Sequence, residues 1–183
     1  MNLLFADVET GGLIPGTHSL LQVGLAAYKD GVVVDTLKFY IKQNTYIVTP
    51  EAMRINGLDL AVLKAEGIDK FKAIDEIVKF IEKNFGTEKP VLVGHNVNFD
   101  KNFLQELFAY NSNNIERYVG HRMIDTMSLL WGLFAAGRIP KEACNSKGAF
   151  DYFNIKVEKL HDALDDTLGT VELFKKIIKM IKI

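Results

Sequence analysis

The chain has 183 residues and a mass of 20.6 kDa, enough for one domain with a substantial hydrophobic core. Its formal net charge of -1 excludes an overall basic field, so a polyanionic partner would have to be held by local groups or metal ions. The single cysteine, Cys144, excludes an internal disulfide and favours the reducing cytoplasm, and no apolar run is long enough to span a membrane.

Turn residues and helix-start residues divide the chain into strands and helices. Asp30-Gly31 between two β-rich runs predicts a hairpin, Thr49-Pro50 predicts the start of a helix, and Gly86 ends another helix. In chain order, the pattern predicts strands over 3–8, 20–28 and 32–41, helices over 50–55 and 68–85, a strand over 91–93, a helix over 99–110, a strand over 123–124, and helices over 126–134 and 162–181.

The two longest helices are expected to bury one apolar face each. Their inward positions are predicted to be Phe71, Ile74, Ile77, Val78 and Ile81 in the first, and Leu164, Leu168, Val171, Phe174, Ile178 and Ile181 in the second. The weakly patterned stretch 135–146 is interpreted as a loop or an insertion. This order of elements predicts a single α/β domain over 1–183, with a mixed sheet and helices on its faces.

Asp7-Val8-Glu9 ends the first apolar strand. Side chains alternate along a strand, so both carboxylates project to the same face, with Cα atoms about 6.6 Å apart. Two like charges this close raise each other's pKa unless a cation lies between them, and a divalent metal ion is the usual solution. The pair alone is also compatible with a calcium site, a glycosidase dyad or a capped strand end.

The next acidic segment follows a short buried strand. Asp100, in Gly94-His95-Asn96-Val97-Asn98-Phe99-Asp100, would lie near a helix start at the carboxyl end of a buried strand, where ligand sites are common. An ordinary acid at the first turn of a helix explains it equally well.

His161 and Asp166 open the final helix. They lie about 140° apart on an ideal helix, so they share a site best when His161 lies in the preceding loop. Histidine is the best general base near neutral pH, although His161 alone is also compatible with a surface loop. Asp162 and Asp165 are explained as charges favoured at a helix N-terminus.

Together these segments resemble the three exonuclease motifs of the DEDDh 3′→5′ exonucleases, a family that includes the epsilon subunit of DNA polymerase III, ribonuclease T and oligoribonuclease. The resemblance runs from Leu3 to about Phe174 and implies a ribonuclease H-like α/β fold, with a mixed five-stranded sheet flanked by helices on both faces. The matching segments are Asp7-x-Glu9-Thr10-x-Gly12, Gly94-His95-Asn96-x-x-Phe99-Asp100 and His161-x-x-x-x-Asp166.

The resemblance implies a role for each matched residue. Asp7, Glu9, Asp100 and Asp166 would hold two Mg²⁺ or Mn²⁺ ions, which suit hard carboxylate oxygens, and His161 would be the general base. Contacts to the terminal nucleotide are implied for Thr10, Gly12, Leu13, Ile55, Asn56, Asn96 and Phe99.

Some of these assignments have alternatives. Many family members have histidine where this chain has Asn56 before Gly57, so that contact is in doubt. Core packing is the alternative for Leu13, Ile55 and Phe99, and a turn is the alternative for Asn96. Asp125 is explained as the cap of the helix that follows it. The segment 135–145 matches nothing in the family.

The implied function is a metal-dependent 3′→5′ exonuclease that releases nucleoside 5′-monophosphates from single strands, with DNA favoured and proofreading or repair as its role. The alternative is an RNA-trimming exoribonuclease similar to oligoribonuclease. Rival interpretations are a catalytically inactive binding module and a metal-stabilised domain without chemistry. Expected partners are the 3′ ends of single-stranded DNA or RNA and a DNA polymerase subunit, without a membrane, in the cytoplasm.

Overall fold

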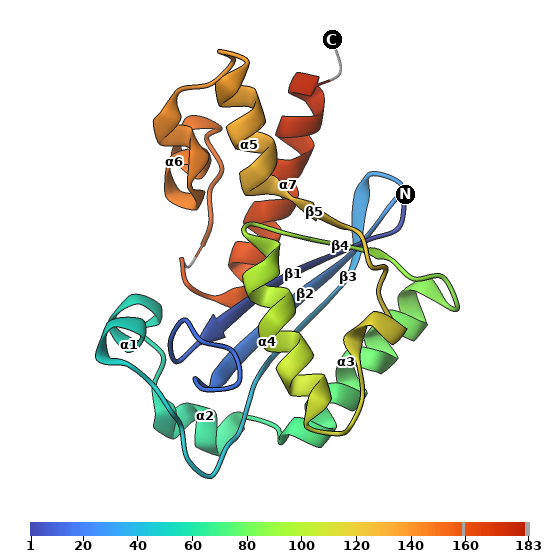
Figure 1. Cartoon of the computed structure of the whole chain (residues 1–183), viewed down its shortest axis with the longest axis vertical. Helices are drawn as coiled ribbons and strands as arrows, with labels where there is room; N and C mark the ends of the chain where they lie inside the picture. Colours follow the sequence, from blue (N-terminus) through green and yellow to red (C-terminus); the bar gives the residue numbers. More distant parts are fainter. Residues whose placement is uncertain (159, 182–183) are drawn as a thin grey trace.

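Five strands form one mixed sheet in the order β3-β2-β1-β4-β5 in the computed structural model, which describes residues 1–158 and 160–181 (Figure 1). β1 pairs antiparallel with β2 and parallel with β4, while β2–β3 is antiparallel and β4–β5 parallel. The strands are β1 (Leu3–Thr10), β2 (Leu20–Lys29), β3 (Val32–Tyr40), β4 (Val91–Gly94) and β5 (Met123–Asp125). This sheet confirms the predicted fold class.

Helices cover both faces of the sheet. The helices are α1 (Pro50–Asn56), α2 (Leu60–Glu66), α3 (Lys70–Phe85), α4 (Val97–Ala109), α5 (Thr126–Ala135), α6 (Ser146–Tyr152) and α7 (Ala163–Ile181), with short 3₁₀ helices η1 (Ile115–Arg117) and η2 (Lys141–Cys144). Leu4 and Ala6 of β1 pack in a core with α3 and α4, whereas Leu3 and Phe5 pack against α7. This alternation therefore assigns every second residue of β1 to the α7 face.

The helix ends follow from local chemistry. The Thr49 side chain caps α1, which stops at Gly57 with a φ of 62°. Asp69 caps α3 by accepting from the backbone N–H groups of Phe71 and Lys72. The predicted boundaries of these helices agree with the structure to within about two residues.

Three expectations from the sequence were wrong. Of the two interpretations of the stretch 135–146, the loop is wrong, because η2 forms within it and α6 begins at its end. In addition, α2 was not predicted. Phe71 is exposed rather than inward, because the first turn of α3 lies at the rim, where its ring packs on Tyr110. Ile181 is also exposed, at the end of α7 beyond the edge of the core. Among the described helices, none is long and apolar enough to cross a membrane.

Candidate active site

The first two carboxylates lie at the carboxyl end of the central strand β1. Asp7 and Glu9 share the face of β1 that packs against α7, and Asp7 lies opposite Gly24 in the β1–β2 ladder. The parallel neighbour β4 pairs only with Leu3 to Phe5, so the end of β1 extends past it into a crevice. The strand geometry therefore fixes the Asp7 and Glu9 carboxylates at the carboxyl-end edge of the sheet.

Asp100 reaches the same point from α4. Asn96 adopts the left-handed conformation with a φ of 63°, and this turn lets α4 begin directly after β4. Asp100 is buried in the first turn of α4, where its Oδ1 accepts a hydrogen bond from the backbone N–H of Val8 at 3.0 Å. The carboxylate is thus tied to the residue between Asp7 and Glu9.

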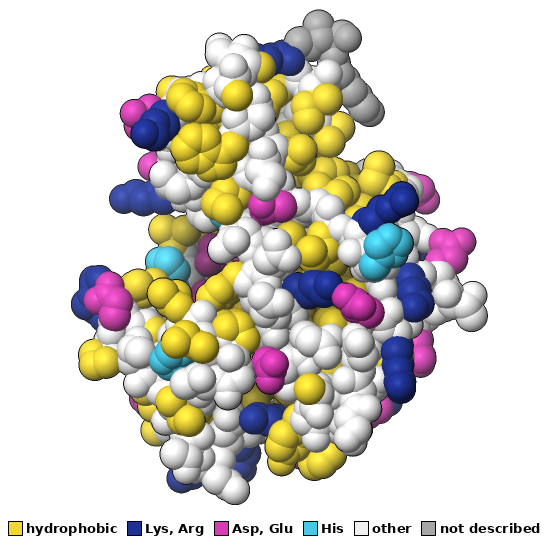
Figure 2. All heavy atoms as spheres, viewed as in Figure 1, with side chains coloured by type: hydrophobic (Ala, Val, Ile, Leu, Met, Phe, Trp, Pro, Cys, Tyr) yellow, Lys and Arg dark blue, Asp and Glu magenta, His cyan; other side chains and the backbone are white. Residues whose placement is uncertain are grey.

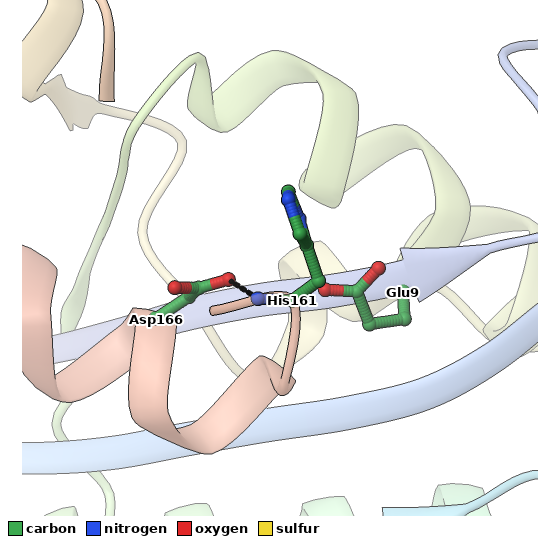
Figure 3. A group of neighbouring side chains, drawn as sticks. All are labelled: Glu9, His161 and Asp166. Carbon is green, nitrogen blue, oxygen red and sulfur yellow. Dashed lines mark hydrogen bonds between the residues drawn. The ribbon is translucent and has the colours of Figure 1, made fainter. Parts of the chain in front are cut away.

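His161 and Asp166 complete the cluster from the start of α7. His161 lies in the loop before the helix with a φ of 62°, a backbone conformation uncommon for residues other than glycine, and its N–H donates to Asp166 Oδ2 at 2.9 Å. One ligand-type atom from each of Glu9, His161 and Asp166 lies within 4.8 Å of the others (Figure 3). Residues far apart in the sequence therefore converge on one site.

Buried contacts fix the start of α7 on the sheet. Gln22 of β2 donates from Nε2 to Asp162 at 3.1 Å and accepts from the backbone N–H of Ala163 at 2.9 Å. Lys38 of β3 forms an ion pair with Asp162 at 3.1 Å. A Cβ on Gly24 would lie 2.3 Å from the backbone of Ala163, so only glycine permits this close approach.

Burial and mutual repulsion dominate the electrostatics of the cluster. Burial, followed by the negative charges of Asp100 and Glu9, holds the pKa of Asp7 well above its usual value. Burial and the charges of Asp166 and Asp162 raise the pKa of Glu9 to about 8. Burial is also the main cause that raises the pKa of Asp166 to about 6. Asp162 differs, because the hydrogen bonds from Lys38 and Gln22 outweigh its burial and lower its pKa.

This arrangement fits divalent cations. Asp166 Oδ1 is buried without a hydrogen-bond partner among the described groups, although buried carboxylate oxygens are normally paired. The acids that surround it repel one another, and hard carboxylate oxygens are the ligands that Mg²⁺ or Mn²⁺ prefers. A cation at this point would bind the unpartnered Asp166 Oδ1 and offset the negative charge of the cluster.

The cluster lines a cleft of about 430 Å³ between the sheet and α6. Asn145, Ser146 and Lys147, at the start of α6, form the wall opposite the carboxylates, together with Leu160. Figure 2 shows the cleft as a hollow between the surface over α6 and the surface over α1, with histidine and acidic side chains exposed in it. The active-site acids are therefore open to solvent on one side.

A second, largely apolar cavity of about 630 Å³ adjoins this cleft. Leu13 is 80% exposed and Ile55 is 45% exposed, and both line the cavity with Phe99. Core packing is therefore wrong for Leu13 and Ile55, whose side chains border an open cavity. Thr10 and Gly12 also line it, and a Cβ on Gly12 would strike the His18 ring.

The remaining predicted contacts have local structural roles. Asn56 is buried and spans from α1 to β1, because its Nδ2 donates to the Thr10 carbonyl and its Oδ1 accepts from the Leu58 N–H. Asn96 is exposed and forms the turn before α4. Asp125 caps α5 as expected and also accepts from the Asn96 N–H at 2.7 Å.

Some residues of the site were not found from the sequence. His95 lines the cleft, half-buried, with Nδ1 3.1 Å from the Thr126 hydroxyl, and burial lowers its pKa. Lys147 lies in a segment without a recognisable pattern. Gln22 was overlooked, although one amide in the apolar run of β2 is a signal for a buried polar anchor.

The fold and the acidic cleft are those of a metal-dependent nuclease. A comparison with protein families matches residues 4–174 to the RNase_T family, described as exonuclease. The chain therefore belongs to this family of DEDD 3′→5′ exonucleases.

Named relatives and solved structures agree with this assignment. The chain is 31% identical to ribonuclease T of Blochmanniella pennsylvanica (strain BPEN), over 96% of this chain and 83% of the relative. It is 28% identical to ribonuclease T of Escherichia coli (strain K12), over 96% and 84% of the two chains.

The fold is similar to that of E. coli exonuclease I in complex with a dT13 oligonucleotide, with a TM-score of 0.83 at 19% identity. It is also similar to a zinc-bound complex of the same enzyme with single-stranded DNA, with a TM-score of 0.84 at 21% identity over 98% of this chain and 40% of that chain. The first match covers 99% of this chain but only 42% of the exonuclease I chain, so this chain spans about two fifths of that enzyme.

Proposed function

We propose that residues 1–183 form a single exonuclease domain that removes nucleoside 5′-monophosphates from the 3′ end of single-stranded nucleic acid, with DNA favoured. The observation that carries this proposal is the convergence of Asp7, Glu9, Asp100, His161 and Asp166 in one open cleft around an unpartnered carboxylate oxygen. Membership of the exonuclease family supports the same reaction.

The four carboxylates are proposed to hold two Mg²⁺ or Mn²⁺ ions. When bound there, such ions would supply positive charge to the scissile phosphate and lower the pKa of a nearby water. His161 is exposed at the cleft, where its imidazole can accept the proton of the attacking water. The bond from its N–H to Asp166 holds its backbone in place for this task.

The apolar cavity beside the cluster is proposed to hold the terminal nucleoside. Leu13, Ile55 and Phe99 offer apolar surface for a base and sugar, and such contacts accept any base. Gly12 serves the cavity indirectly, because its missing side chain leaves room for the His18 ring, which also lines the cavity. Asn56 and Asn96 serve this site through the loop conformations that they hold.

A preference for DNA is supported by two polar groups of this cavity that are already engaged within the protein. Recognition of RNA requires groups that pair with the 2′-hydroxyl. The Thr10 hydroxyl donates to the Gly12 carbonyl at 2.8 Å, and the Asn56 amide donates to the Thr10 carbonyl. The ribonuclease T name of the relatives favours the second candidate, an RNA-trimming exoribonuclease.

The proposed partners follow from this activity. They are the 3′ ends of single strands and, for a proofreading or repair role, a DNA polymerase subunit. A cytoplasmic location fits both the substrate and the single cysteine.

The test uses 5′-labelled single-stranded DNA and RNA oligonucleotides with Mg²⁺, Mn²⁺ or EDTA. We expect metal-dependent shortening from the 3′ end, faster on DNA. H161A should lower the rate by about 10²- to 10⁴-fold, whereas D151N, which changes an exposed acid of α6, should not. No shortening of either polymer with any metal would refute the proposal, and full activity of H161A would refute the role of His161 as the general base.

A further inference from the structure

The polarity of the reaction assigns the two cavities different parts of the substrate. The bond that a 3′→5′ exonuclease breaks joins the phosphate of the terminal nucleotide to the 3′ oxygen of its neighbour. The two cavities meet at Val8, Glu9 and Phe99, which line both of them. With the terminal nucleoside beside Leu13 and its phosphate at the carboxylates, the retained strand must leave through the cleft below α6.

The wall of α6 presents one cation to that path. Lys147 is exposed and is the only lysine or arginine in the lining of either cavity, among the residues that the structure describes. No carboxylate in the described ranges lies within ion-pair distance of its ammonium group, so Lys147 is not a counter-charge for the acidic cluster. Its charge is available to a ligand.

The backbone that carries Lys147 is firmly held. Asn145 caps α6 by accepting from the Gly148 N–H at 2.9 Å and donates to the Glu142 carbonyl at 3.3 Å. A Cβ on Gly148 would overlap the Glu142 carbonyl, so η2 and α6 meet in close contact. The side-chain oxygen and nitrogen of Asn145 are therefore both engaged, and Lys147 is the charged group that this wall offers to a strand.

We propose that Lys147 binds a backbone phosphate of the retained strand, on the 5′ side of the scissile bond, and thereby sets the affinity for oligonucleotides. The inference rests on the proposed function and adds a substrate contact to it. The cleft acids repel the phosphates that lie beyond the cluster, so one lysine on the facing wall offsets that repulsion where the strand leaves. A phosphate contact of this kind carries no base specificity.

The experiment compares a substrate with a retained strand to one without. The first is a 5′-labelled single-stranded oligonucleotide, and the second is the p-nitrophenyl ester of thymidine 5′-monophosphate, which has only the terminal nucleotide. For K147M we expect KM for the oligonucleotide to rise about 5- to 10-fold with kcat nearly unchanged, while hydrolysis of the ester stays at the native level. K147R should keep most of the affinity, because it keeps the charge.

Salt dependence and a matched control separate a phosphate contact from a structural effect. Loss of one phosphate contact to a single strand should lower the slope of log affinity against log salt by about 0.7. The slope is measured from KM and from the anisotropy of a labelled oligonucleotide in EDTA, where turnover is absent. K141M changes an exposed lysine of η2 that lines neither cavity and should leave both slopes unchanged.

The inference is overturned if K147M leaves the oligonucleotide KM and the salt slope unchanged, if it impairs the ester equally, or if K141M has the same effect. Failure of the proposed function gives a different result, because the native protein would then hydrolyse neither substrate. The EDTA binding measurement decides the role of Lys147 in that case too.

Discussion

Replacing Glu9 with glutamine tests whether the acidic cluster is destabilised in the absence of cations. Burial and the charges of Asp166 and Asp162 raise the pKa of Glu9 from 4.5 to about 8. Each unit of pKa corresponds to about 1.36 kcal/mol, so this rise would destabilise the charged form of Glu9 in the folded state by about 5 kcal/mol. This value is an upper bound, because neighbouring acids share the proton. E9Q removes the charge and keeps the size of the side chain.

The direction in which stability changes with pH follows from the rise in the pKa of Glu9. A carboxyl whose pKa is raised in the folded state stabilises the fold below its unfolded pKa of 4.5, and this contribution is lost as pH rises through about 8. Metal-free native protein should therefore lose stability between about pH 5 and 9, whereas E9Q should lose less. In EDTA at pH 8 we expect E9Q to be more stable than the native protein by about 2–4 kcal/mol.

Urea unfolding followed by circular dichroism measures this difference at pH 5 and pH 8, with EDTA or with Mg²⁺. With Mg²⁺ the advantage of E9Q should shrink or reverse, because the cation neutralises the native cluster and stabilises the state that binds it. E106Q removes an exposed charge of α4 outside the cluster and serves as the control. Equal stability of E9Q and the native protein in EDTA at pH 8, or the same advantage at pH 5, would refute the reasoning.

Three further substitutions test two supports of the site and one proposed contact with substrate. G24A should destabilise the protein by about 1–3 kcal/mol in urea unfolding, because its Cβ would strike the backbone of Ala163. Q22A should cost about 1–3 kcal/mol and lower the exonuclease rate, since it removes partners of Asp162 and Ala163; an unchanged rate would separate the anchor from catalysis. L13A should change stability by less than about 0.5 kcal/mol, because the side chain is 80% exposed, yet raise KM; an unchanged KM would exclude a contact with substrate.

The sequence predicted the features of this fold that depend on local pattern. Alternation along β1 placed Asp7 and Glu9 on one face, and the turn after β4 placed Asp100 at a helix start near the strand end. The position of His161 outside α7 also followed from the angle between residues on a helix. These predictions succeed because the periodicity of strands and helices relates residues that lie only a few positions apart in the sequence.

Other features could not be predicted because they depend on tertiary contacts. The wall that carries Lys147 begins at η2, where Ala143 and Cys144 are buried against neighbouring helices without a helical or strand period of their own. The anchor between Gln22 and Asp162 joins residues 140 positions apart, which no local pattern encodes. Exposure of Leu13 likewise depends on how the loop after β1 meets α1.

The two halves of the site are held by different means, and this difference locates its weakest point. Asp7, Glu9 and Asp100 are fixed by the central strand and by the bond from Val8 to Asp100. His161 is exposed in a loop and depends on the attachment of the start of α7, which rests on the Gln22 contacts and on the missing side chain of Gly24. Loosening that attachment would displace the proposed base while leaving three acids in place. Variants of the anchor should therefore bind divalent cations better than they turn over substrate, a separation that variants of the acids themselves cannot produce.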